Sequence, residues 1–499
     1  MLKSIPLFFI AAILSTPARA RDDRPDDSFD VVPLQGAAAQ RPPFEFSDQD
    51  QAFLDEVQRG CFNFLWNTAG NKTGMVYDRT SKPVASVAGV GFQLSALPIG
   101  VERGWITRQQ GHDRARLILR SLLDNTSNRK AGLYFHYLDP EDAGITHDAY
   151  EVTVSTIDSA LLFAGAITAA SYFKGDVAQA ADRMLDEADW TFFVPADEAV
   201  EKPYERGYIS LGWKPRDKNN PTADGTLLPF YWADAGDEQK LVTFLAVAAP
   251  RADHRVSTEM YYRMRRTPGR DEDGPIFMWF PWSGALFTNF FAHCWIDYAG
   301  MNPDNPAAQG VPHRPRVDWW ENSRRAVQMH RRKAALNPLS LPTLGPDAWG
   351  LTACDADSGY LVPGLFPTLV PLPGARPDFD YTTFQPPENY GDGTVAPYGA
   401  GCSIIFEPQA ALAALRYYRS LNAADGSPLL WRDPAAGGHG FKDSFNLGKM
   451  WVAPDCVAID QGPMILAIEN ARTGLIWNLF HQHPAVQDAV RRLGLQRAR

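Results

Sequence analysis

Residues 147–166 read His-Asp-Ala-Tyr-Glu-Val-Thr-Val-Ser-Thr-Ile-Asp-Ser-Ala-Leu-Leu-Phe-Ala-Gly-Ala, and they are the most informative stretch of this chain. Glu151, Ser155 and Asp158 stand at positions i, i+4 and i+7, so a helix over 151–173 would carry them on one face. The opposite flank is apolar and is typical of a helix that packs into a core. We predict that the acidic edge faces a cleft; a solvated polar face is the alternative.

The first 46 residues predict export and a linker. Residues 1–20 combine Lys3, an apolar run over 5–14 and a small-x-small cleavage site at Ala18-Arg19-Ala20, which indicates a signal peptide. Residues 21–46 are rich in Asp, Arg, Pro and Ala and predict a flexible linker. Residues 47–499 then form a single domain. We expect a periplasmic or secreted protein after cleavage near Ala20.

Composition excludes several classes of function. The net charge of −10 disfavours nucleic acid and an anionic membrane as partners. The five cysteines show no CxxC spacing, and His136 and His147 lack the spacing of a metal site. Phosphate-binding, dinucleotide and serine-hydrolase motifs are missing from the sequence. We therefore expect no metal or other cofactor, and a monomer whose disulfide state is open.

Helical periodicity recurs along the whole domain, with long Gly- and Pro-rich connections. It predicts an all-α fold, a double ring of antiparallel helices with long rim loops and small β-hairpins near 132–137 and 207–210. Asp460 precedes Gln-Gly-Pro and is predicted as an N-cap, with a ligand as the alternative. The expected helices cover residues 48–66, 84–101, 107–125, 151–173, 176–192, 234–248, 285–299, 318–336, 403–420, 460–473 and 484–494.

An ordered set of motifs runs through nearly the whole domain. The motifs occupy residues 87–92, 97–105, 155–162, 318–323, 349–355, 392–397, 441–446 and 459–463. In this order they resemble the glycoamylase-like domain of bacterial β-1,2-glucanases and of cyclic β-1,2-glucan synthases. The resemblance implies an (α/α)6 barrel that acts on a β-glucan or oligosaccharide substrate.

The resemblance also implies the catalytic residues. In the endo-β-1,2-glucanase branch they are acidic residues on the helix matching 151–158 and a glutamate matching Glu238. Ser155 and Asp158 depart from that pattern, in which some members carry Asp and Glu. Glycoside hydrolysis needs an acid and a second carboxylate. We expect Glu238 and Glu151 to handle protons, with their two roles unassigned, and Asp158 to orient substrate or water; a charge favoured by the helix dipole is the alternative for Glu238.

Aromatic and polar residues on loops suit a sugar ring, which has apolar faces and polar edges. For some of them packing or a turn is an open alternative, notably for Trp320 and Asp392. The predicted substrate-binding residues are Ser155, Tyr231, Trp232, Trp282, Trp320, Glu321, Asp347, Trp349, Asp355, Asp392 and Arg79.

These observations lead to one functional hypothesis with named rivals. The expected protein is an exported glycoside hydrolase that cleaves β-1,2-glucan with inversion and releases sophoro-oligosaccharides. Endo and exo action are both open, as are the exact linkage and the chain length. The rivals are a β-1,2-glucan transglycosylase, a non-catalytic periplasmic glucan-binding protein, and an enzyme for another polysaccharide.

Overall fold

The computed structural model describes residues 39–146, 151–217, 220, 224–370 and 388–498. The predicted signal peptide, most of the predicted linker and His147 lie outside these residues. Within the described part, the short stretch 39–46 packs against the domain, which contradicts a linker there. Phe44 is 7% exposed, and Arg41 pairs with Asp318 and lies over the Trp320 ring.

Two helices without a polar stripe form the centre of the molecule. α2 (Val87–Glu102) and α4 (Thr156–Phe173) are buried on nearly every side. They touch through glycine, because a Cβ on Gly91 would lie 2.2 Å from the Leu161 carbonyl oxygen and one on Gly165 would lie 2.0 Å from that of Gly91. By length and composition α4 could cross a membrane, but 89% of it is buried inside the protein.

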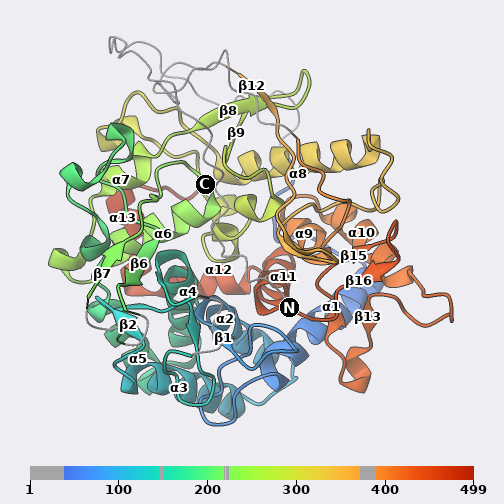
Figure 1. Cartoon of the computed structure of the whole chain (residues 1–499), viewed down its shortest axis with the longest axis horizontal. Helices are drawn as coiled ribbons and strands as arrows, with labels where there is room; N and C mark the ends of the chain where they lie inside the picture. The colour runs from blue at the N-terminus through green and yellow to red at the C-terminus, as the bar shows by residue number, and fades with distance from the viewer. Residues whose placement is uncertain (1–38, 147–150, 218–219, 221–223, 371–387, 499) are drawn as a thin grey trace.

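The remaining inner elements continue a ring around α2 and α4. α4 packs against α6, α6 against η5 and η6, η6 against α11, and α11 against both α9 and α2. Figure 1 shows α2, α4 and α11 around the middle of the molecule, with α3 and α5 outside them. The further inner elements are α6 (Asp237–Ala248), η5 (Leu286–Asn289), η6 (Ala292–Cys294), α9 (Pro397–Cys402) and α11 (Ala458–Arg472).

An outer layer of helices covers this ring. α1 packs on α11, α3 on α2, α5 on α4, α13 on α6, α8 on η5 and α10 on α9. The predicted double ring of helices is confirmed. The outer helices are α1 (Asp48–Asn67), α3 (Arg108–Asp124), α5 (Gly175–Glu187), α8 (Trp319–Leu336), α10 (Pro408–Ser420) and α13 (Pro484–Leu493); α7 (Thr258–Arg263) and α12 (Leu475–Gln482) are additional.

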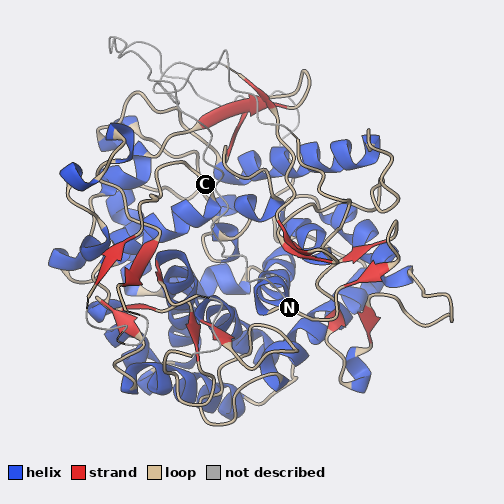
Figure 2. Ribbon diagram, in the orientation of Figure 1, coloured by secondary structure: helices blue, strands red, loops and turns tan. Residues whose placement is uncertain are grey.

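Strands are short and lie in the connections between helices (Figure 2). Three-stranded antiparallel sheets are formed by β12-β8-β9 and β5-β6-β7, and the other strands pair two by two. Their bounds are β1 85–86, β2 129–130, β3 133–134, β4 137–138, β5 154–155, β6 212–215, β7 225–227, β8 267–270, β9 277–279, β10 354–356, β11 359–361, β12 368–369, β13 431–432, β14 440–441, β15 445–446 and β16 451–452.

Two predicted helices differ from the structure in an informative way. α4 begins only at Thr156, because Val154 and Ser155 pair with β6 as strand β5 and Ser155 caps the helix. The β-branched run before it favours extended backbone. Residues 285–299 form short 3₁₀ helices rather than one α-helix, since Asp237 accepts the Ala292 backbone N–H and interrupts the helical pattern.

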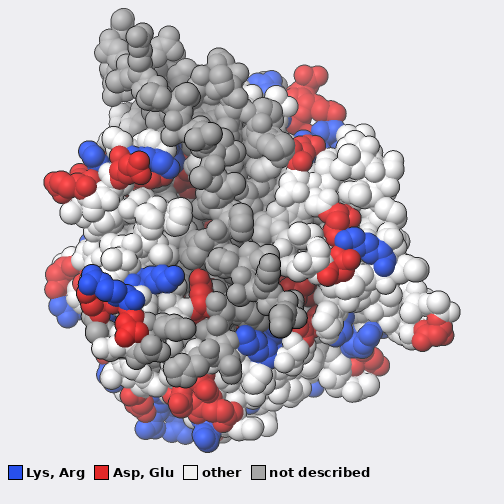
Figure 3. Space-filling model, in the orientation of Figure 1, with Lys and Arg blue, Asp and Glu red and all other residues white. Residues whose placement is uncertain are grey.

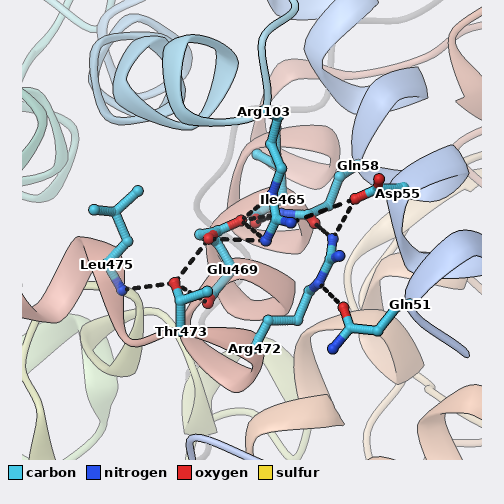
Figure 4. Close-up of polar contacts among 9 residues, drawn as sticks. All are labelled: Gln51, Asp55, Gln58, Arg103, Ile465, Glu469, Arg472, Thr473 and Leu475. Carbon is cyan, nitrogen blue, oxygen red and sulfur yellow. Dashed lines mark hydrogen bonds and ion pairs between the residues drawn. The ribbon is translucent and has the colours of Figure 1, made fainter. Parts of the chain in front are cut away.

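A buried polar network fastens the far end of α11 to α1 and to the end of α2 (Figure 4). The Glu469 side chain is 2% exposed and accepts hydrogen bonds from Arg103 at 2.8 Å and from Gln58 at 3.0 Å. Arg472 binds Asp55 at 2.6 Å and Gln58 at 2.5 Å. This network therefore closes the ring between α1, the first helix of the domain, and the inner helix α11.

Candidate functional site

Three carboxylates lie in the first turns of inner helices. They are Asp158 on α4, Glu238 on α6 and Asp460 on α11. Successive helices of a double ring alternate between the layers and run in opposite directions, so the inner helices share one direction and their first turns meet at one end of the ring. The prediction that Asp460 is an N-cap is wrong, because α11 starts at Ala458 and Val457 occupies the cap position.

His136 joins the two acidic residues that the sequence placed on one helix face. Glu151 precedes α4 instead of lying on it, so that prediction is wrong as geometry. Nevertheless, the His136 ring contacts Glu151 Oε1 through Nδ1 at 2.9 Å and Asp158 Oδ1 through Nε2 at 3.4 Å. Burial disfavours the charged ring, but Asp158 and Glu151 outweigh it and raise the pKa of His136 to about 9. The ring is thus an imidazolium between two carboxylates, and it stacks on Tyr137 at 3.9 Å.

Glu238 has the electrostatic setting of a general acid. Burial, the neighbouring charge of Asp158 and then that of Asp237 raise the pKa of Glu238 to about 8. A carboxyl group with such a pKa carries its proton at neutral pH and can deliver it to a leaving group. Burial also raises the pKa of Asp158, although the His136 charge opposes that shift.

A buried ion network fixes the start of α6 beneath Glu238. Asp237 Oδ1 binds Lys240 Nζ at 2.8 Å, and Asp237 Oδ2 contacts His293 Nδ1 at 2.8 Å. Lys240 also lies 4.0 Å from the centre of the Trp319 ring. His293 and Lys240 lower the pKa of Asp237 to about 2 despite its burial, so this carboxyl group is ionised at neutral pH. The network holds the backbone from which Glu238 projects.

A second acidic group surrounds the first turn of α11. Arg79 binds Asp355 at 2.8 Å and Asp78 at 3.3 Å. Burial and the neighbouring Asp443 raise the pKa of Asp460 well above its usual value. The structure therefore adds Asp443 to the predicted Asp355 and Arg79, and it places Asp460 with them in the first turn of α11.

Tyr360 on β11 belongs to the surroundings of the second acidic group. It pairs with Asp355 in the β10–β11 hairpin and is 41% exposed. Partial burial raises the pKa of the Tyr360 hydroxyl, and the charges of Cys354, Asp460 and Glu238 add to this shift.

Several predicted sugar-binding residues are structural. Trp232 is 6% exposed and donates its N–H to Thr156, and Trp320 is 1% exposed and donates to the Ile405 carbonyl oxygen. Four further predicted substrate-binding residues also make structural contacts within the protein. Trp349 is fully buried beside Tyr418, Glu321 is buried in ion pairs with Arg324 and Arg325, Asp392 forms a turn with Thr394 and pairs with Lys449, and Ser155 is the buried cap of α4.

The other predicted contacts remain accessible. Tyr231 is partly exposed, Trp282 is 36% exposed, and Asp347 is exposed on its loop. The sequence did not indicate the contacts of His136 or the place of Asp443, whereas it offered a ligand role for Asp460 as an alternative to the N-cap. A histidine in a predicted hairpin shortly before Glu151 was the only signal available for His136, and nothing in its spacing points to a carboxylate bridge.

The charges of the described surface favour an uncharged ligand, or one with charges of both signs, over a polyanion. Figure 3 shows Lys and Arg side chains intermingled with Asp and Glu over the described part of this face. Among the described residues, no group of three or more His, Cys, Asp or Glu side chains could hold a metal ion. Their chemistry is that of carboxylates, one imidazolium and aromatic rings.

Comparison with known proteins agrees with this architecture. The glycoamylase family, described as putative glucoamylase, matches residues 229–484. An exo β-1,2-glucooligosaccharide sophorohydrolase (non-reducing end) from Parabacteroides distasonis is 26% identical over 488 residues, which cover 89% of this chain. The chain spans 58% of the length of that curated relative.

Solved structures share the fold over nearly the whole chain. A putative glucoamylase from Bacteroides uniformis has a TM-score of 0.72 at 26% identity, covering 91% of this chain and 99% of its own. An endo-β-1,2-glucanase from Chitinophaga pinensis, solved with sophorotriose and glucose, has a TM-score of 0.71 at 22% identity, with the same coverage of 91% and 99%. The second likeness concerns the fold alone.

Proposed function

The chain belongs to the glycoamylase family, and from that premise we propose that it is a glycoside hydrolase that cleaves β-1,2-glucan and releases sophoro-oligosaccharides. The observation that carries the proposal is Glu238, a carboxyl group in the first turn of α6 whose pKa burial and the charges of Asp158 and Asp237 raise to about 8. The names of the relatives supply the glucan linkage. The sequence of residues 1–20 supports export as part of the same proposal.

In this proposal Glu238 protonates the glycosidic oxygen as the bond breaks. Glu151 activates water, and His136 holds its carboxylate in place through the 2.9 Å contact. Asp158 orients substrate or water next to Glu238. Inversion requires carboxyl groups about 6.5–9.5 Å apart, with water between them.

The carboxylates around α11 offer a second candidate for the base. Asp443 accepts hydrogen bonds from Ser444 Oγ at 2.8 Å and from the Asp355 backbone N–H at 2.9 Å, which hold its carboxyl group in a fixed orientation. The Glu151→Gln and Asp443→Asn variants separate the two assignments. Loss of the base costs about 100-fold or more in kcat, so the variant with that loss identifies it.

The first experiment tests hydrolysis itself. Purified protein and its Glu238→Gln variant are incubated with linear β-1,2-glucan, and reducing ends and product sizes are followed. We expect cleavage by the wild type and its loss in the variant, and the size ladder separates endo from exo action. Binding without any cleavage by the wild type would refute the hydrolase and favour a glucan-binding protein.

A further inference from the structure

A cluster of aromatic and charged side chains stands where the chain enters α6. At its base, Arg265 and Asp234 form a buried double contact, with Nε to Oδ1 at 3.0 Å and NH2 to Oδ2 at 2.5 Å. Their side chains are 2% and 3% exposed. The Arg265 guanidinium also lies 4.2 Å from the centre of the Tyr204 ring. Such a planar, two-point pair is rigid.

This pair holds the indole of Trp282. The Trp282 N–H donates to Asp234 Oδ2 at 2.6 Å, while 36% of the residue remains exposed. A surface tryptophan normally turns about its side-chain bonds, but here its polar edge is tied to a buried carboxylate. The indole is therefore held by its polar edge while part of the residue stays accessible, as a stacking platform requires.

The platform lies next to the proposed acid. Asp234 precedes Glu238 by four residues in the segment that leads into α6. A Cβ on the intervening Gly236 would lie 3.4 Å from the Phe280 ring, so the chain before Trp282 packs directly on this segment. Trp282, two residues after Phe280, and Glu238, two residues after Gly236, therefore lie on neighbouring segments.

Two polar groups border the same cluster. Glu205 is partly exposed, and burial raises the pKa of its carboxyl although Lys202 lies within 3.5 Å. Tyr231 is close enough for the Glu205 charge to raise the pKa of its hydroxyl further after burial. A carboxylate and a phenol beside a flat ring match the neighbouring hydroxyl groups and the apolar face of a glucose unit.

We infer that Trp282, Tyr231 and Glu205 form a binding subsite for one glucosyl unit of the chain, adjacent to the bond that Glu238 protonates, and that Asp234 and Arg265 position the Trp282 platform. This inference rests on the proposed function and names part of its substrate site. Glu205, Asp234 and Arg265 gave no signal in the sequence. In this inference, these side chains alone bind the glucosyl unit, and no metal ion or cofactor takes part.

The test separates substrate binding from catalysis. Kinetics on linear β-1,2-glucan oligosaccharides are measured for Trp282→Ala, Trp282→Phe and Glu205→Gln. We expect Trp282→Ala to raise KM about tenfold with kcat nearly kept. Trp282→Phe keeps a ring but loses the N–H, so it should fall between the alanine variant and the wild type. Glu205→Gln should raise KM in the same sense.

The positioning role has its own measurement. Asp234→Asn should reproduce the KM of Trp282→Phe and shift the tryptophan fluorescence, whereas Asp271→Asn, at the outlying ion pair with Arg332, should change neither. If Asp234→Asn does not fold, the Trp282→Phe result decides. Active wild type with an unchanged KM in Trp282→Ala would overturn the inference.

Calorimetry with the same oligosaccharides on the Glu238→Gln background distinguishes failure of the proposed hydrolysis from failure of the proposed subsite. An inactive wild type whose oligosaccharide binding weakens in Trp282→Ala would refute hydrolysis but support the subsite. An inactive wild type whose binding ignores Trp282 would refute both.

Discussion

Removing the Asp158 charge should shift the alkaline limb of the pH dependence of kcat/KM. A general acid must carry its proton, so kcat/KM should fall as the pH rises through the pKa of Glu238, about 8. Burial is the main cause of this high pKa, and Asp158 is the next. In Asp158→Asn the repulsion disappears and Glu238 loses its proton more easily, so the alkaline limb should move to lower pH.

The size of the shift follows from the order of these causes. The charge of one neighbouring carboxylate typically changes a pKa by about one unit, which is equivalent to about 1.4 kcal/mol. Burial persists in the variant, so the pKa of Glu238 should stay well above 4.5, the ordinary value of a glutamate side chain. The amide oxygen of the new side chain can still accept a hydrogen bond from His136, so the site geometry should be kept.

The assay is reducing-end release from linear β-1,2-glucan at constant ionic strength across the neutral and alkaline range. Asp113→Asn on the exposed surface of α3 is the matched control, and its limb should coincide with that of the wild type. A wild-type limb far below pH 8, or equal limbs for wild type and Asp158→Asn, would refute the electrostatic reasoning. A shift toward higher pH would do so as well.

Three further predictions concern stability. Glu469→Gln removes the anion from the network of Figure 4 and should lower the free energy of unfolding by about 3 kcal/mol, measured by urea denaturation; an unchanged midpoint would contradict it. Lys240→Met leaves the buried Asp237 charge with less compensation and should cost about 3–5 kcal/mol, seen as a lower Tm, and an equal Tm would count against the network. Gly165→Ala should destabilise strongly because its Cβ would meet backbone at 2.0 Å, whereas Gly345→Ala, with open space, should be tolerated; similar stability of both would refute the close approach.

The sequence predicted the layers of this fold better than its local geometry. Helical periodicity located most of the ring, because apolar spacing reports burial directly. It failed at 285–299, where the carboxylate of a distant residue, Asp237, binds backbone N–H groups and replaces the helical pattern. The periodicity also misplaced Ser155, for a local reason: a serine can occur either as the N-cap of a helix or on its exposed surface, and here it is the cap of α4.

Candidate site residues came from the resemblance and from loop composition rather than from the periodicity that located the helices. Glu238 was predicted from the resemblance, and Asp355 from its place in a Gly-rich loop. Tryptophans misled the prediction, since Trp232, Trp320 and Trp349 fill the core while Trp282 alone of these is held at the surface. The sequence does not show which partner satisfies an indole N–H, and that partner decides whether the ring packs or binds.

The network in Figure 4 also determines when folding can be completed, because its α11 side is synthesised long after its α1 side. Gln58 and Glu469 are 411 positions apart, so the contact that closes the ring joins the beginning of the domain to its end. Contacts of such long range slow folding. While the chain is being synthesised, α2 lacks its neighbour α11 and leaves an apolar flank uncovered. A nascent chain that ends before α11 therefore offers a binding surface to chaperones and has no assembled carboxylate cleft.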